Sequence, residues 1–369
     1  MSENRLFFHI NWAFLGLSLL LFGLGVMNLY SASTLRVEGG MALDPFYRKQ
    51  LVWGAVGICG MVAFMLFDYR HLKSLAWPLF WGAVILLVAV PLWGKTILGA
   101  RRWLSFGLFN LQPSELAKIA VLILGARVLA RMEGTLSWGM LGRVLLIGLV
   151  PAGLIIRQPD LGSGLSVLLL LGGMILFRGV RKRVFQVLSL VVPVCLPFGW
   201  FFLHDYQKQR ILTFLDPGSD PLGAGYHILQ SQIAIGSGGF WGKGFLEGTQ
   251  SQLRFLPEKH TDFAFAVFGE EWGFAGAMVL LGLFCAFLYQ IFIVSQEAKD
   301  EFGSFLCAGV FFYFFWQVLI NMGMVLGLMP VVGIPLPFIS YGGSASVVNF
   351  CLIGLVMNVS MRRFVFKKG

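Results

Sequence analysis

The chain has 369 residues, of which 57% are hydrophobic and only 12% charged, and its 28 Lys and Arg residues exceed its 18 Asp and Glu residues. A soluble domain typically has about 45 to 50% apolar and about 25% charged residues, so this composition excludes a water-soluble globule. Disorder is also excluded, because 36 Phe and 11 Trp contradict its low hydrophobicity. A membrane protein remains, and its basic excess is more typical of loops that contact anionic lipid headgroups than of nucleic-acid binding.

Ten segments are apolar enough to cross about 30 Å of hydrocarbon as helices of roughly 20 residues. We therefore expect an all-α, polytopic integral membrane protein that forms a single domain over residues 1–369. In chain order the expected spans are residues 12–30, 51–67, 75–93, 115–130, 141–156, 161–177, 184–203, 263–294, 305–329 and 347–361.

The distribution of Lys and Arg predicts the orientation. If the N-terminus is cytoplasmic, the cytoplasmic segments hold about twice as many Lys and Arg residues as the short outer loops, which predicts that both termini are cytoplasmic. A long connection, residues 204–262, then lies on the outer face between the seventh and eighth spans. Its many aromatic and leucine residues favour a segment that is folded against the membrane over a disordered one.

Charged side chains at bilayer depth cost about 2.5 to 3.5 kcal/mol each and are therefore functional candidates. In the fourth span, Glu115 and Lys118 are three residues apart on one helical face, where they can neutralise each other. The pair can be a structural ion pair or the wall of a charged cavity, and the spacing alone favours neither. Asp160, which follows Pro159 between two spans, is expected to cap a helix rather than to act in catalysis.

The eighth span is too long for a single crossing, because residues 263–294 would rise about 48 Å at 1.5 Å per residue. Residues 274–294 suffice, so residues 261–273 are expected to form an outer helical extension or a steeply tilted segment. Asp262 opens this segment. It can be an N-cap, which would lower its pKa and weaken it as a base. Alternatively, the neighbouring Glu258, Lys259 and His260 indicate a catalytic site.

Two motifs contain closely spaced glycines. GSGGFWGKG, residues 236–244, lacks the spacing and the Lys-Ser/Thr ending of a phosphate-binding loop, and we expect a flexible turn. PLPFISYGGSAS, residues 335–346, leads into the last helix, where the backbone N–H groups of Gly342 and Gly343 can either meet an anion or pack the loop.

The cysteines occur singly in apolar stretches, so we expect no disulfide and no metal site, only small buried hydrophobic residues. They are Cys59, Cys195, Cys285, Cys307 and Cys351.

The expected outer face carries several cations, although such residues normally concentrate in the cytoplasm. Arg and Lys bind pyrophosphate oxygens well, and a nearby carboxylate can take a proton from a sugar hydroxyl. This combination predicts glycosyl transfer from a polyprenyl-pyrophosphate donor. The candidate cations are Arg48, Lys49, Arg101, Arg102, Arg210 and Lys259, with Lys118 at the mouth of the fourth span.

Six motifs, in order along the chain, closely resemble the bacterial shape, elongation, division and sporulation (SEDS) family. The wording RFLPEKHTDF and the short ends favour the rod-shape branch of that family over the division branch. The motifs are GARRWL (99–104), QPSELAKIA (112–120), RQPDLGS (157–163), FLDPGSDPLGAGYHILQSQIAIGSGG (214–239), FLPEKHTDFAFAVFGEEWG (255–273) and GIPLPFISYGGSA (333–345).

The resemblance implies a ten-helix peptidoglycan glycosyltransferase that polymerises lipid II at the outer face of the bacterial cytoplasmic (inner) membrane. It also implies a class B penicillin-binding protein, a transpeptidase, as partner within the elongation machinery. No nucleic acid is expected as a partner. No cofactor or dedicated metal site is expected, and help from a divalent cation is left open.

The resemblance assigns the family's essential aspartate to Asp262, its functional Glu and Lys to Glu115 and Lys118, and its outer Arg-Trp motif to Arg102 and Trp103. Asp262 is expected to be ionised and to accept the proton of an attacking sugar hydroxyl. We expect the other substrate-binding candidates to be Arg48, Arg101, Arg210, Lys259, His260 and Ser340.

Three alternatives remain. A lipid II flippase requires charged groups along a path through the bilayer, whereas the charges here cluster at the outer ends of the spans. A non-catalytic scaffold for the partner synthase should tolerate loss of Asp262. A division-type paralogue would perform the same chemistry at the septum.

Overall fold

Helices make up most of the chain in this computed structural model, which describes residues 9–33, 37–38, 41–42, 45–97, 100–105, 107, 110–203, 205–220, 223–253, 255–256 and 258–363. The α-helices are α1 (Trp12–Ser33), α2 (Phe46–Leu66), α3 (Arg70–Trp93), α4 (Pro113–Leu129), α5 (Trp138–Arg157), α6 (Leu161–Arg178), α7 (Lys182–Gly199), α8 (Asp205–Leu215), α9 (Ala224–Gly238), α10 (Thr249–Gln252), α11 (Ala264–Glu297), α12 (Glu301–Val325) and α13 (Gly343–Arg362). Short strands and turns occupy the connections: β1 (Val37–Glu38), β2 (Met41–Ala42), β3 (Lys95–Ile97), β4 (Ala100–Ser105), β5 (Asn110–Leu111), and the 3₁₀ turns η3 (Trp200–Phe202) and η4 (Pro217–Ser219).

Within the described residues, eight helices are long and apolar enough to cross a membrane: α1, α2, α3, α5, α6, α11, α12 and α13. The expected all-α, polytopic membrane protein is thus confirmed. The other two expected spans correspond to α4, which has 17 residues, and to α7, which contains Pro193 and Pro197. The number of ten crossings therefore stays a prediction.

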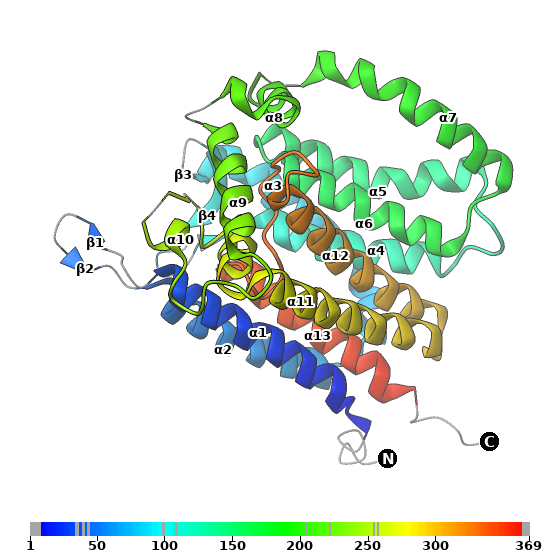
Figure 1. Ribbon diagram of the computed structural model, residues 1–369. Coiled ribbons are helices and arrows are strands. Elements are labelled where there is room, and N and C mark those ends of the chain that lie inside the picture. The colour runs from blue at the N-terminus through cyan, green and yellow to red at the C-terminus, as the bar shows by residue number, and fades with distance from the viewer. Residues whose placement is uncertain are drawn as a thin grey trace.

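The helices form a bundle whose centre is built from α4, α12 and α13 (Figure 1). These three helices bury most of their residues, whereas α2, α3 and α5 each leave one apolar face exposed, as expected of helices that contact lipid. In Figure 1, α7 arches away from α5 and α6. Close packing of α13 on α2 depends on glycine, since a Cβ at Gly354 would clash with the Met61 backbone and one at Gly57 with Phe350.

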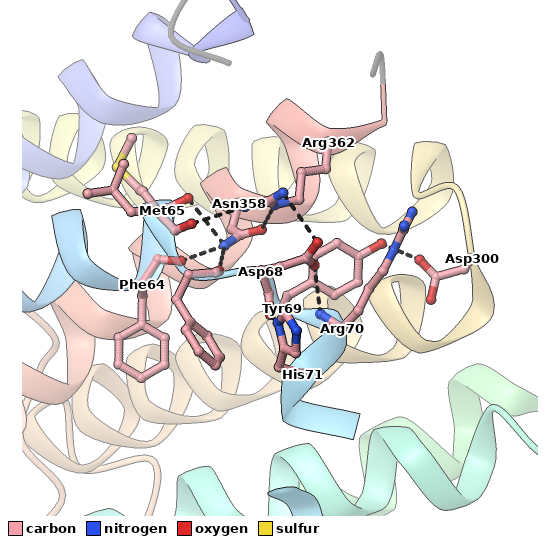
Figure 2. Close-up of polar contacts among 11 residues, drawn as sticks. Phe64, Met65, Asp68, Tyr69, Arg70, His71, Asp300, Asn358 and Arg362 are labelled. Atoms are coloured by element: carbon pink, nitrogen blue, oxygen red, sulfur yellow. Dashed lines mark hydrogen bonds and ion pairs between the residues drawn. The ribbon is translucent and has the colours of Figure 1, made fainter. Parts of the chain in front are cut away.

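One end of the bundle is held by polar contacts between turns that are far apart in sequence (Figure 2). The Asn358 amide of α13 donates to the carbonyls of Phe64, Met65 and Phe67, where α2 ends and its carbonyls lack helical partners. Tyr69 donates its hydroxyl to Asp300, which also caps α12 through the Gly303 N–H. The start of α3 and the ends of α2 and α13 are therefore fixed to the start of α12.

The opposite end of the bundle carries the larger connections. The sheet β3–β4–β5 lies between α3 and α4, and α8, η4, α9 and α10 form much of the expected long connection. The first residue of that connection, His204, lies outside the described residues, as do Arg5, Lys367 and Lys368, which contribute to the basic count of the two ends.

The long eighth span is interrupted where the expected outer extension, residues 261–273, ends. α11 includes one non-helical residue, Gly273, with φ of 65°, a backbone conformation that glycine adopts without the steric cost that other residues incur. A break of this kind exposes backbone groups that must find other partners.

The glycine-rich motif supplies those partners. Its residues 239–241 form a turn, as predicted, and backbone hydrogen bonds join the motif to α11. The N–H groups of Lys243 and Gly244 donate to the carbonyls of Glu270 and Glu271, on one side of the break. On the other side, the N–H groups of Phe274 and Ala275 donate to the carbonyls of residues 239 and 240. A Cβ at Gly238 or at Gly242 would clash with backbone atoms of residues 269–272. The glycines are therefore needed for close approach of two backbones.

The cysteines are less uniform than expected. Cys307 is buried and Cys351 partly buried, but Cys59 and Cys285 are exposed on the helix surfaces, so their prediction as buried residues is wrong. All four are free thiols. The side chain of Cys195 lies outside the described residues.

Candidate active site

A cavity of about 420 Å³ opens at the end of the bundle that carries β4 and α8. Segments far apart in sequence form its wall: β4, the starts of α4 and α6, α8, the turn before α11, and the approach to α13. Its polar and aromatic lining comprises Arg102, Trp103, Gln112, Glu115, Lys118, Asp160, Ser163, Ser166, Arg210, Glu258, Thr261, Asp262, Tyr341 and Ser344.

Asp262 lies in a tight turn between Glu258 and α11. The N–H groups of Thr261 and Phe263 both donate to the Glu258 carbonyl, at 3.0 and 3.4 Å. Phe263 is the N-cap residue of α11, and no side chain caps that helix. The alternative of Asp262 as a helix cap is therefore wrong, and its carboxylate is left to face the cavity.

A buried amide fixes the backbone of this turn. Asn321 of α12 donates to the Asp262 carbonyl at 3.0 Å and to the Ile334 carbonyl at 2.8 Å. It thereby holds the Asp262 turn against residues 332–345, which form another wall of the cavity. Sequence reasoning missed Asn321, although an amide inside an apolar span is a recognisable signal.

Burial, aided by the nearby Glu258 carboxylate and opposed by Arg210 and Arg102, raises the pKa of the Asp262 carboxyl to about 6. A carboxyl group with this pKa is mostly ionised at neutral pH, yet it binds a proton more readily than an ordinary aspartate. This property suits a general base.

Glu115 and Lys118 form the expected ion pair, with 2.6 Å between the Lys118 Nζ and the Glu115 Oε1. Tyr313 of α12 donates its hydroxyl to Glu115 at 3.4 Å, and the Lys118 ammonium lies 5.3 Å from the centroid of the Tyr313 ring. Both charged residues are buried and both line the cavity. The pair is therefore both a structural ion pair, which joins α4 to α12 through Tyr313, and part of the charged wall of a cavity, so the two alternatives are compatible.

Arg102 and Trp103 reach the cavity from β4. Arg102 donates to the Pro159 carbonyl, next to Asp160. As expected, Asp160 caps α6 by accepting the Ser163 N–H at 3.1 Å, but it also lines the cavity. Its place in the site was not expected.

Tyr341, Ser344 and Glu258 also line the cavity. Tyr341 and Ser344 lie within the motif PLPFISYGGSAS and had no assigned role, whereas Glu258 was among the residues that indicated a catalytic site. Membership of these motifs could therefore have predicted that all three residues belong to the site.

Five of the expected substrate-binding residues lie outside the residues that line the cavity, as does the candidate cation Lys49. Arg48 contacts the Tyr47 hydroxyl and Arg101 the Pro91 carbonyl, both on exposed surface. Lys259 donates to the Ser251 carbonyl, and His260 stacks on Phe46 with ring centroids 3.9 Å apart.

Ser340, the fifth, is buried, and its hydroxyl accepts the Leu336 N–H at 2.9 Å. Within the described part of the chain, no group of three or more His, Cys, Asp and Glu side chains is arranged to hold a metal ion.

The chain is similar to known proteins over nearly its whole length. The FtsW/RodA/SpoVE family model, described as "Cell cycle protein", matches residues 11–364. The peptidoglycan glycosyltransferase MrdB of Escherichia coli K12 is 43% identical over 344 residues, which cover 92% of each chain. The probable peptidoglycan glycosyltransferase FtsW of Geobacter sp. strain M18 is 38% identical over 92% of this chain and 93% of its own.

Two solved structures share the fold. A chain from a peptidoglycan synthase complex, described as coordinating polymerization and crosslinking, superposes with a TM-score of 0.82 at 31% identity, covering 96% of this chain and 98% of its own. The rod shape determining protein RodA of Thermus thermophilus superposes with a TM-score of 0.71 at 29% identity and the same coverage. The chain is an integral membrane protein that belongs to the shape, elongation, division and sporulation (SEDS) family, the family of FtsW, RodA and SpoVE.

Proposed function

We propose that this protein is a peptidoglycan glycosyltransferase that polymerises lipid II into glycan strands for cell-wall elongation and rod shape. The observation that carries the proposal is one cavity in which Asp262, with a pKa of about 6, faces Arg102, Lys118 and Arg210. The similar proteins named peptidoglycan glycosyltransferase MrdB and RodA support the same activity and the rod-shape branch.

In the proposed reaction, the Asp262 carboxylate accepts the proton of the 4-hydroxyl of N-acetylglucosamine on an incoming lipid II. The freed oxygen attacks the anomeric carbon of the N-acetylmuramic acid that ends the growing strand. The bond between that carbon and the pyrophosphate oxygen breaks, and undecaprenyl pyrophosphate leaves. Because the donor is α-linked and the product β-1,4-linked, a single inverting displacement suffices, without a covalent enzyme intermediate.

The cations stabilise the leaving group. Negative charge develops on the departing pyrophosphate, and fixed cations in a partly buried cavity stabilise such charge better than water does. Arg102, Lys118 and Arg210 line the cavity and are the residues that we assign to this role. Arg48, Arg101, Lys259, His260 and Ser340 contact other parts of the protein and receive no role in the reaction.

We place the active site on the outer face of the bacterial cytoplasmic membrane, with both termini in the cytoplasm. The Lys and Arg bias of the sequence supports this orientation. A class B penicillin-binding protein, which crosslinks the new strands, is the proposed partner. The similar chain from a synthase complex that coordinates polymerization and crosslinking supports it.

The decisive experiment measures glycan polymer formed from lipid II by the purified protein, with and without the partner. Asp262→Asn keeps the shape of the side chain but cannot accept the proton, so the rate should fall by about 10² to 10⁴-fold. Asp205→Asn, at the exposed start of α8 and outside the cavity, is the matched control and should retain activity. Full activity of Asp262→Asn would exclude Asp262 as the base, whereas a wild-type protein that forms no polymer without the partner would leave the scaffold alternative.

The flippase alternative is separated by a reconstituted assay that measures polymer and lipid translocation independently. The proposed function requires polymer from lipid II supplied on one side only. Translocation without polymer would contradict it.

A further inference from the structure

A second groove lies on the lipid-facing side of the bundle, between α3, α4 and α5, near the end opposite the candidate active site. Its volume is about 400 Å³. The groove is almost wholly apolar, with aromatic side chains along one wall and a single charged group. The lining residues are Trp77, Phe80 and Trp81 of α3, Val128 of α4, and Arg143, Leu146, Ile147 and Val150 of α5.

The charged group of this groove is unusual for its position. Arg143 lies five residues after the start of α5, about 7.5 Å along the helix, and is exposed on its surface. Among the residues that the structure describes, Arg143 has neither an ion pair nor a side-chain hydrogen bond. The acid nearest to it in sequence, Glu133, is not part of the groove. A cation without a protein counter-ion on the lipid-facing side of a helix, near the membrane surface, can be compensated by an anionic headgroup or by water.

The order of the lining residues matches the order of groups in a phospholipid. Along α5, Arg143 comes first, and Leu146, Ile147 and Val150 follow on the same face at intervals of three and four residues. Along α3, which runs in the same direction, Trp77 precedes Phe80 and Trp81, and these rings pack edge to face. The cation is thus nearest the membrane surface on which α3 and α5 begin, and the apolar wall lies deeper.

We propose that this groove is a binding site for an anionic diacyl phospholipid of the cytoplasmic leaflet. Its phosphate pairs with the Arg143 guanidinium, and an acyl chain lies along the aromatic wall of α3. Tryptophan rings near the membrane surface suit this arrangement, because they combine an apolar body with a polar N–H group. The bound lipid fills the space between α3 and α5, and it stabilises the fold by binding only the folded protein.

The test measures lipid retention by native mass spectrometry of the full-length protein in detergent, with phosphatidylglycerol or phosphatidylcholine added. Wild-type protein should retain phosphatidylglycerol at least about fivefold better than phosphatidylcholine. Arg143→Gln should remove this preference. Arg131→Gln is the control, because Arg131 is an exposed cation at the same end of the bundle but lies outside the groove.

A second pair of variants keeps the cation and changes only the groove. Leu146→Trp should fill it and weaken retention of both lipids, whereas Leu149→Trp, also exposed on α5 but not in the groove, should not. Phosphatidylglycerol should also raise the melting temperature of the wild type but not that of Arg143→Gln.

Equal retention of the two lipids by the wild type, or equal loss of preference in Arg131→Gln, overturns the proposal. Stronger retention of added undecaprenyl phosphate than of phosphatidylglycerol overturns the diacyl assignment. None of these readouts involves glycan synthesis, so they are independent of the proposed activity.

Discussion

The Glu270 carboxylate, which is wholly buried, lies 2.8 Å from the Lys243 ammonium. The same carboxylate accepts the N–H groups of Gln250 and Ser251, in the first turn of α10, at 2.8 and 3.1 Å. Lys259 in turn donates to the Ser251 carbonyl. A continuous series of polar contacts therefore runs from the break in α11, through the glycine-rich motif and α10, to the turn that carries Asp262.

Breaking this ion pair should destabilise the protein. Lys243→Met leaves the buried Glu270 without its cation, and removing one partner of a buried pair typically costs about 3 to 5 kcal/mol. Since Lys243 is partly exposed and backbone N–H groups still contact Glu270, we expect the lower end of this range. The melting temperature measures the loss. Lys208→Met, which breaks an exposed pair at 3.9 Å, is the control and should change it little.

Two glycines of α9 provide a test of how closely the glycine-rich motif packs on α11, because only one of them contacts it. Gly238→Ala places a methyl group against the carbonyls of Gly269 and Glu270, and we expect a loss of about 1 to 3 kcal/mol from the strain. Gly236→Ala has open space around it and should be neutral or slightly stabilising. Equal melting temperatures for the two variants would contradict close backbone docking.

The activity should depend on pH through Asp262. The base must be ionised, and its pKa is about 6, so kcat/KM should fall tenfold per pH unit well below pH 6 and level off above it. Glu258→Gln removes a neighbouring negative charge and should move the midpoint to lower pH. Glu247→Gln, on the exposed surface outside the cavity, should leave the midpoint unchanged.

The same pKa shift has a consequence for stability. The folded protein binds a proton at Asp262 up to about pH 6, whereas the unfolded chain releases it near pH 3.8. Between these values the folded state holds more protons, so this group reduces stability as the pH rises through the window. Asp262→Asn should therefore melt no lower than the wild type at pH 7.5. A lower melting temperature would mean that the carboxylate stabilises the fold.

The turn shown in Figure 2 allows a matched test of the other end of the bundle. Tyr69→Phe removes the hydroxyl that Tyr69 donates to Asp300 and should cost about 1 kcal/mol. Burial, aided by Asp300, raises the pKa of the Tyr69 hydroxyl, so it remains a donor throughout the physiological range. Tyr289→Phe changes an exposed tyrosine of α11 and should leave the melting temperature unchanged.

Sequence reasoning located part of the site because some of its interactions join residues that are close together in the sequence. Glu115 and Lys118 are one helical turn apart, so their pairing follows from helix geometry alone. The same holds for Asp160, which caps the helix that it precedes. Arg48 and Arg101 were indistinguishable from Arg102 and Arg210 at this level, because a basic residue in an outer loop has the same local pattern whether or not it faces a cavity.

The amino-acid sequence by itself determined that this protein lies in a membrane, where most of its spans fall, and which residues pair within one helix. These properties depend on the burial of about 20 consecutive apolar residues and on helical periodicity, and both are local. Only the tertiary structure decided that Arg102, Arg210 and Asp262 share one cavity, and that residues 238–244 complete the break in α11. Residues that are far apart in the sequence meet at these places because of how helices and loops pack against one another. Local sequence patterns do not specify that packing.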